Sequence, residues 1–249
     1  MSHSIDIHNK VALVTGANRG IGKVIAESFL ENGAKKVYAA VRDTATANQL
    51  IEKYGERVSA IPLDLTKPQT ITDAANSASD TEIVVNNAGV LTCTTPFDNN
   101  AIENLNFEMD INVGGLIRMA QAFAPMLKKN GGGAFIQLNS IASVKNFVPF
   151  TTYSASKAAA YSVTQSLRDL LSEQDTFVMS VHPGPIATDM GDDAGLSEIA
   201  EPATLVSDAI VKGLKQGAFH VFPDTMAKQI ESAYQNFAEN VVEANLMES

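Results

Sequence analysis

Apolar residues are distributed along the chain in two alternating patterns. Short, nearly continuous apolar runs are typical of strands that are buried on both faces of a parallel sheet. Such runs predict strands at residues 11–15, 36–41, 58–61, 82–86, 133–139, 176–182 and 219–222. The sequence therefore predicts a sheet of mostly seven parallel strands.

Longer segments with a helical period separate these runs. In the first of them, Ile21, Ile25 and Phe29 recur at helical spacing, and Gly33 suits the end of a helix. Similar patterns predict helices at 44–54, 68–78, 101–128, 152–173, 202–216 and 224–247. Strands that alternate with helices are typical of a doubly wound α/β fold of the Rossmann type, with helices on both sides of the sheet. No linker or repeat interrupts the pattern, so residues 1–249 are expected to form a single domain.

Composition narrows the possible partners. The chain carries 18 basic and 28 acidic residues, a formal charge of −10, which argues against binding to nucleic acid or to an anionic membrane surface. The single cysteine, Cys93, cannot form an intramolecular disulfide, and no apolar segment resembles a signal peptide or a membrane span. We therefore expect a cytoplasmic protein. The four histidines show no metal-ligand spacing, so no metal is expected.

A glycine-rich turn follows the first predicted strand and leads into a helix. It contains Gly16, Asn18, Arg19, Gly20, Ile21 and Gly22. Glycines allow a tight turn and a close approach to phosphate, and a helix N-terminus offers free amide groups to an anion. A turn without any ligand is the alternative. The position of the glycine-rich turn in the first strand–helix–strand unit favours a dinucleotide site.

The second strand ends at Val41, and Arg42 and Asp43 follow it. In dinucleotide-binding folds an acidic residue here binds the ribose hydroxyls, whereas a nearby arginine accommodates a 2′-phosphate. Arg42 and Arg19 can converge on that phosphate, so we expect NADP(H). The alternative is that both arginines are surface residues and that Asp43 binds the ribose.

Candidate chemistry lies further along the chain. Tyr153 and Lys157 are one helical turn apart, and Ser140 follows the strand predicted at 133–139. The ammonium group is expected to lower the phenol pKa and so make Tyr153 a general acid, with Ser140 donating a hydrogen bond to the same oxygen. A Tyr–Lys pair at this spacing is also common on exposed helices, so the pair needs further support.

That support comes from a set of motifs that occur in order along the chain. They are TGANRGIG (15–22), NNAG (86–89), Ile111-Asn112-Val113, the serine of Leu138-Asn139-Ser140, YSASK (153–157) and the segment Pro183-Gly184-Pro185-Ile186-Ala187-Thr188. In these motifs, over about residues 8–222, the chain resembles the short-chain dehydrogenase/reductase family, in its compact single-domain branch.

The resemblance implies roles for the matching positions. Asn112, Ser140, Tyr153 and Lys157 would form the catalytic tetrad, with Asn112 holding a water of a proton relay. The cofactor would contact Asp64, Leu65, Asn87, Ala88, Gly89, Tyr153, Lys157, Pro183, Gly184, Ile186 and Thr188, in addition to the glycine turn and Arg42. The implied activity is reversible, NADPH-dependent reduction of a ketone or aldehyde.

Two alternatives stay open, a 3-oxoacyl thioester reductase and an NADP(H)-binding sensor without turnover. The substrate pocket is expected to contain Leu91, Ile141, Val144, Phe147, Met190 and Leu196, which favours a small apolar or aryl carbonyl compound. Residues 189–201, with Gly191 and Gly195, are expected to form a mobile lid whose Met190 and Leu196 turn toward the substrate.

The carboxyl end departs from the family pattern. Many members end in a short glycine-rich tail at a tetramer axis, whereas residues 224–247 here form an amphipathic pattern. A homo-oligomer is still expected, either a dimer through the helices near 101–128 and 152–173 or a tetramer.

Overall fold

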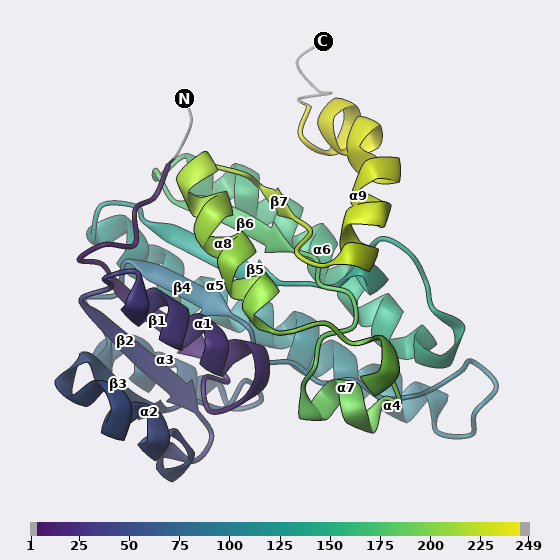
Figure 1. The fold of residues 1–249 in the computed structure, drawn as a ribbon, viewed down its shortest axis with the longest axis horizontal. Helices are drawn as coiled ribbons and strands as arrows, with labels where there is room; N and C mark the ends of the chain where they lie inside the picture. The colour runs from purple at the N-terminus through teal and green to yellow at the C-terminus, as the bar shows by residue number, and fades with distance from the viewer. Residues whose placement is uncertain (1–3, 245–249) are drawn as a thin grey trace.

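The computed structural model of the protein describes residues 4–244, and within them a seven-stranded parallel sheet (Figure 1). The strands lie in the order β3-β2-β1-β4-β5-β6-β7, and every neighbouring pair is parallel. Their bounds are β1 Val11–Thr15, β2 Lys36–Val41, β3 Val58–Pro62, β4 Ile83–Asn86, β5 Ala134–Leu138, β6 Phe177–Val181 and β7 His220–Val221. The predicted Rossmann-type sheet is confirmed.

Burial on both faces explains why the strand sequences are continuously apolar. In β1, Ala12 and Val14 belong to the core on one face, whereas Val11 and Leu13 belong to the core on the other. Because successive side chains of a strand point to opposite faces, a strand between two cores needs apolar residues at every position.

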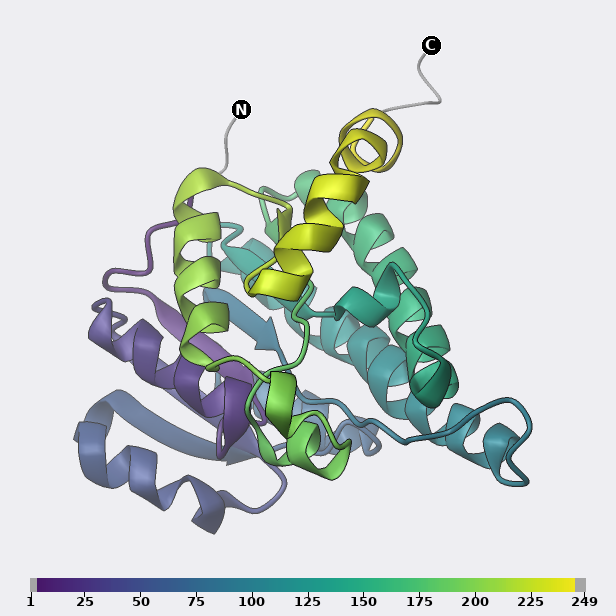
Figure 2. The same cartoon turned by 45° about the vertical axis from the view of Figure 1, so that its right-hand side comes forward.

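Helices cover both faces of the sheet (Figures 1 and 2). One face carries α1 Gly20–Glu31, α2 Asn48–Tyr54 and α8 Thr204–Gln216, and the other carries α3 Pro68–Ser77, α5 Gly115–Lys129 and α6 Thr151–Ser172. Three further helices are α4 Ala101–Glu108, α7 Asp189–Asp193 and α9 Thr225–Phe237. Among residues 4–244, no helix has the length and apolar character that crossing a membrane requires.

Some predicted elements have different bounds. The helix expected at 101–128 consists of α4, a π-helical turn at Met109–Gly114, and α5. The π-helical turn contains Asn112, whose side chain accepts a hydrogen bond from the Val90 amide and donates one to the Val90 carbonyl. Gly115 permits the close packing that follows, because a Cβ there would lie 3.0 Å from the Cβ of Leu65.

Corrections of the same kind apply at other positions. The first turn of the helix expected at 44–54 is a 3₁₀ turn, Thr44–Ala47, which the Asp43 side chain caps. The strand expected at 219–222 is reduced to β7, because Phe222 leaves the sheet to pack with Ile141 and Ala227. The helix expected at 224–247 is α9 followed by a π-helical turn at Ala238–Val242, and residues 245–247 lie outside the described part.

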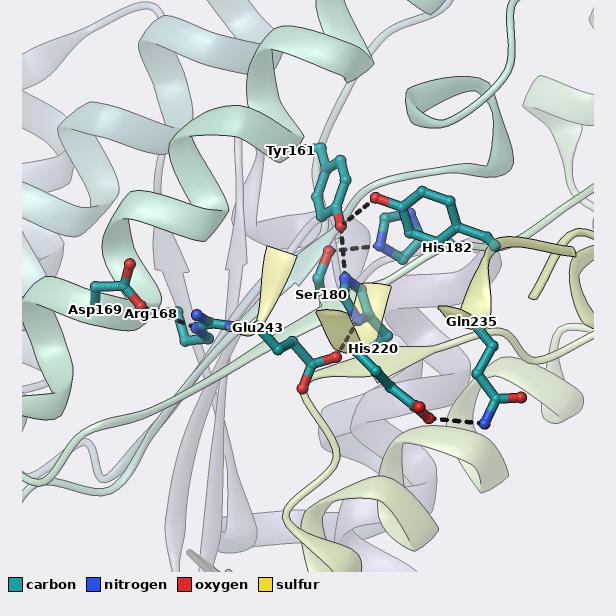
Figure 3. A network of polar contacts seen from close by, with 10 residues as sticks. Tyr161, Arg168, Asp169, Ser180, His182, His220, Gln235 and Glu243 are labelled. Carbon is teal, nitrogen blue, oxygen red and sulfur yellow. Dashed lines mark hydrogen bonds and ion pairs between the residues drawn. The ribbon is translucent and has the colours of Figure 1, made fainter. Parts of the chain in front are cut away.

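A polar network attaches the C-terminal segment to the β7 edge of the sheet (Figure 3). The His220 ring is 2.6 Å from the Tyr161 hydroxyl through Nε2 and 2.8 Å from the Glu243 carboxylate through Nδ1. Tyr161 is also 3.1 Å from the hydroxyl of Tyr234 on α9. The segment after β7 therefore packs back onto its own domain through both apolar and polar contacts.

Candidate active site

A cleft of about 960 Å³ opens at the carboxyl ends of the strands. Its lining includes Gly16 after β1, Val41 at the end of β2, Asn87 after β4 and Leu138 at the end of β5. The strand order reverses between β1 and β4. In open α/β sheets this switch point is where ligands bind, so the cleft lies where the fold predicts a site.

The glycine turn forms one wall of the cleft. Gly16 and Gly20 have φ angles of 67° and 52°, and a Cβ on Gly22 would collide with the carbonyl oxygen of Gly16. Arg19, at the N-terminal cap of α1, makes no side-chain capping bond, so it leaves the first amides of the helix free to meet a ligand. Gly16, Asn18, Arg19, Gly20 and Ile21 line the cleft, whereas Gly22 supports it from behind. This arrangement fits a pyrophosphate.

Two arginines lie at the corner beyond β2. Arg42 and Arg19 both line the cleft, and Arg42 forms no ion pair with any residue of 4–244. Asp43 also lines the cleft, but its carboxylate accepts a bond of 3.0 Å from the amide of Ala45. Arg19 pairs with Asp189 of α7 at 2.9 Å. Within the part of the chain that the structure describes, the corner therefore holds Arg42 without an ion pair and Arg19 paired with α7.

The residues expected around the adenine nucleoside lie in the same cleft. Asp64, Leu65, Asn87, Ala88 and Gly89 all line it. The Asp64 carboxylate accepts hydrogen bonds from the hydroxyl and the backbone amide of Thr66. These bonds hold the pKa of the carboxyl below its ordinary value, and the bond from the hydroxyl has the larger effect. Asn87 is fixed by a bond of 2.8 Å from its side-chain amide to the Thr15 carbonyl.

Tyr153 and Lys157 meet at the floor of the cleft, as their spacing predicts. The Lys157 ammonium donates to the carbonyl of Leu138 at 2.8 Å and lies 5.7 Å from the centre of the Tyr153 ring. Ser140 is buried and does not line the cleft, and its hydroxyl donates to the carbonyl of Pro183 at 3.3 Å. A phenol and an ammonium therefore meet at the floor of the cleft.

The expected lowering of the Tyr153 pKa is wrong for this structure. Burial raises the pKa of the phenol to about 12, the nearby Ser140 hydroxyl opposes the rise, and the charge of Glu108 adds to it. Burial lowers the pKa of Lys157 to about 8. The helical spacing establishes that the two groups are neighbours, but burial, not the ammonium, sets the direction of the phenol pKa.

Asn112 lies close by but does not line the cleft. Its Oδ1 accepts from the amide of Val90 at 3.0 Å, and its Nδ2 donates to the Val90 carbonyl and to the Ser156 hydroxyl. The structure therefore gives Asn112 a positioning contact with the chain segment after β4.

The expected nicotinamide and substrate residues divide into two groups. Pro183, Thr188, Leu91 and Met190 line the cleft. The others do not, and they are Gly184, Ile186, Ile141, Val144, Phe147 and Leu196. Most of these pack elsewhere: Ile186 is part of the core, Ile141 and Phe147 pack with Phe222, and the Gly184 amide donates to Asp224.

Several residues of the cleft were not found from the sequence. Cys93, Phe107, Asp189 and Asp193 all line it. Asp189 directly follows Thr188, but no pattern of residues indicates that its carboxylate reaches Arg19 across the cleft. Among residues 4–244, no group of three His, Cys, Asp or Glu side chains is arranged to hold a metal ion.

A cleft that joins a glycine-rich helix N-terminus to a neighbouring Tyr–Lys pair is typical of dinucleotide-dependent oxidoreductases. The family model described as short chain dehydrogenase matches residues 10–198. The chain therefore belongs to the short-chain dehydrogenase family and is an oxidoreductase of that family.

Individual relatives agree with this assignment. An uncharacterised oxidoreductase of Staphylococcus epidermidis is 34% identical over 219 residues, which cover 84% of this chain and 93% of the relative. A short chain dehydrogenase from Burkholderia cenocepacia, solved in complex with NADP, has a TM-score of 0.84 and 34% identity over 95% of this chain and 99% of its own. A family member from Burkholderia phymatum, in complex with NAD, has a TM-score of 0.83, covers 97% of each chain and, at 18% identity, shows the fold alone.

Proposed function

We propose that the protein uses NADPH to reduce a small apolar or aryl ketone or aldehyde to an alcohol, reversibly. The observation that carries the proposal is the joint placement of Tyr153 and Lys157 on the floor of a cleft whose far corner holds Arg42. NADPH, when bound, supplies the hydride that reduces the carbonyl carbon.

The chain's own residues would manage the oxygen and its proton. Tyr153 donates its phenolic proton to the developing alkoxide, and Ser140 donates a hydrogen bond to the same oxygen. Lys157 supports the phenol electrostatically and, as the family resemblance implies, binds the nicotinamide ribose. Asn112 fixes the segment after β4, and the family resemblance would also give it the water of a proton relay.

The cofactor preference rests on the charges at the corner beyond β2. Arg42 is free of ion pairs within residues 4–244, and Asp43 is occupied in capping the next turn. A free guanidinium favours a 2′-phosphate, whereas a ribose diol is best met by a free carboxylate. The related structure from Burkholderia cenocepacia, which holds NADP, supports the same choice.

The substrate class follows from the apolar residues of the cleft. Leu91, Phe107, Ile111 and Met190 supply apolar surface, and Asp193 adds a carboxylate. An anionic keto acid or the acidic carrier protein of a 3-oxoacyl thioester would be repelled by Asp193. We therefore favour a neutral carbonyl substrate over the thioester alternative.

We also propose that the protein is a homo-oligomer. Ile117 on α5 and Leu170 on α6 are apolar side chains that are 40% and 63% exposed. Exposed apolar groups on these two helices support association through them, and light scattering at two protein concentrations tests it.

Turnover separates the reductase from a sensor that only binds NADPH. Wild-type protein should oxidise NADPH with a panel of neutral ketones, and Tyr153→Phe should lower kcat by about 10²–10⁴-fold because it removes the proton donor. Binding of NADPH, measured by fluorescence titration, should persist in the variant. Binding without turnover in the wild type would favour the sensor, and a variant within threefold of wild type would assign the acid role elsewhere.

A further inference from the structure

Glu108 is a buried carboxyl group beside the reaction site that the proposed mechanism leaves unused. It is the last residue of α4, its side chain is 0% exposed, and no Lys, Arg or His of residues 4–244 forms an ion pair with it. A buried charge without a cationic partner is costly unless hydrogen bonds stabilise it. Such a group calls for an explanation.

The contacts of Glu108 all go to one short segment. Its Oε1 accepts from the backbone amide of Thr92 at 2.7 Å and from the Thr92 hydroxyl at 2.8 Å. Oε2 is buried and has no hydrogen-bond partner within the described residues. Thr92 lies in the chain that leaves β4, next to Leu91 and Cys93, which line the cleft.

Glu108 and Asn112 act on this segment together. Asn112, one turn later, bonds both the amide and the carbonyl of Val90, as Glu108 bonds Thr92. Two side chains from one helical face therefore fix residues 90–92 along the wall of the cleft. The resemblance to the family gives a role to Asn112 but none to Glu108.

The same contacts reach the helix that carries Tyr153. The Thr92 hydroxyl is 3.4 Å from the hydroxyl of Thr152, which precedes Tyr153, and the Thr94 carbonyl accepts from the amide of Thr151. Glu108 is thus connected through Thr92 to the residue that precedes Tyr153, and after burial its negative charge is a further cause of the raised pKa of Tyr153.

We propose that Glu108 is a positioning residue that fixes residues 90–92 against the start of α6 and whose negative charge favours the protonated form of Tyr153, the proton donor in carbonyl reduction. The proposal rests on the proposed function in assigning Tyr153 the acid role. Within the described residues, the other titratable or charged groups that line this cleft are Lys157 on α6, Asp189 and Asp193 on α7, Arg19, Arg42, Asp43, Asp64 and the thiol of Cys93. Ser140, which does not line the cleft, contributes a neutral hydroxyl.

An exchange of similar shape that removes the charge separates the two parts of this role. Glu108→Gln keeps an acceptor for Thr92 but removes the charge, so we expect the Tyr153 pKa to fall and the amount of Tyr153 phenolate at pH 10.5 to rise severalfold. The readout is the resonance of [¹³Cζ]tyrosine, assigned with Tyr153→Phe. The alkaline limb of alcohol oxidation by NADP⁺ should move to lower pH by a similar amount.

Three further variants serve as controls. Glu103→Gln removes a charge from an exposed position of α4 and should leave the phenol unchanged. Glu108→Asp keeps the charge but shortens the reach to Thr92, and Thr92→Val removes only the hydroxyl bond. Both should raise KM more than they lower kcat, with no gain in phenolate.

The test of the Glu108 proposal does not depend on measuring turnover. If Tyr153 ionises equally in wild type and Glu108→Gln, the proposal is overturned. If Glu108→Gln does not fold, the ¹³C resonance of the Glu108 carboxyl in the wild type decides, because a protonated carboxyl at pH 7 also overturns it. Absence of carbonyl reduction together with a shifted phenol would reject the proposed function and retain the electrostatic role of Glu108.

Discussion

Arg42 is the residue on which the choice of cofactor depends most directly. Replacing it with Asp should lower kcat/KM for NADPH by about 10–100-fold, because a charge-assisted bond to the 2′-phosphate is lost and a repulsive carboxylate takes its place. The efficiency with NADH should rise or stay unchanged, since that carboxylate can accept the ribose hydroxyls. Initial rates with the two cofactors measure both effects.

A matched charge reversal provides the control. Lys215→Asp makes the same change on an exposed position of α8 outside the cleft, and should leave the ratio of the two cofactors unaltered. Equal or better use of NADH by the wild-type protein would show that the corner beyond β2 serves the ribose diol instead.

For single residues, the Tyr153–Lys157 pair shows what sequence spacing can predict and what it cannot. Helical spacing predicted correctly that the two side chains are neighbours. It did not reveal how far folding withdraws the phenol from water, nor that the charge of Glu108 acts on it, so the predicted direction of the Tyr153 pKa was wrong. Burial and distant charges depend on tertiary packing, which a local pattern does not record.

Among the elements, α7 has an unexpected contact with the glycine turn. Asp189 at its start holds Arg19 at 2.9 Å, and a Cβ on Gly20 would lie 3.1 Å from the side chain of Thr188. If Arg19 also binds a 2′-phosphate, Asp189 competes with that phosphate for the same guanidinium.

Asp189→Asn should therefore tighten the binding of NADPH. Exposed ion pairs are weak, so the gain in affinity should be about twofold to fivefold, with NADH binding unchanged. Asp192→Asn, on the same helix but outside the cleft, is the control. Fluorescence titrations of both cofactors give the answer, and equal effects on NADPH and NADH would show that Asp189 does not compete with the 2′-phosphate.

The segment at 189–201 illustrates what could be predicted for an element. The bridge between Ile186 and Glu201 closes its base, and Met190 reaches the cleft as expected, but Leu196 does not. Likewise, apolar periodicity located the helical stretch at 101–128 but missed its π-helical turn. That turn coincides with the Asn112–Val90 contact, which only the folded chain brings together.

At the scale of the whole molecule, the alternation of strands and helices was sufficient to predict the sheet, because each buried strand carries its own apolar run. The end of the sheet at β7 was harder to predict, since its polar network joins residues from α6, β7 and the C-terminal segment. Two histidines of this region, His182 and His220, lie with their ring centres 5.7 Å apart in the interior.

His182 is held as a neutral ring. Its Nδ1 lies 2.9 Å from the Ser143 hydroxyl, which itself donates to the Ser140 carbonyl, and 3.2 Å from that carbonyl, so Nδ1 carries the proton. Its Nε2, 2.7 Å from Ser180, accepts from that hydroxyl. Burial, and then repulsion from His220, lowers the pKa of His182 to about 3, and burial lowers the pKa of His220 as well.

These two histidines should make the folded state sensitive to acid. In the unfolded chain a histidine takes up a proton near pH 6.5, whereas folded His182 stays neutral until about pH 3. The stabilisation is complete above pH 6.5 and is lost as the pH falls below it. His182 alone should lower the free energy of unfolding by about 1.4 kcal/mol per pH unit in that window. Urea unfolding at pH 7.0, 6.0 and 5.0 measures this slope.

His182→Gln should flatten the slope, whatever its effect on stability at pH 7, whereas the same exchange at exposed His8 should not. Should His182→Gln fail to fold, ¹⁵N imidazole spectra of the wild-type protein at pH 5 give an independent answer. A neutral His182 ring at that pH agrees with the burial of its site, and a doubly protonated ring would show that the interior beside Ser140 admits a charge.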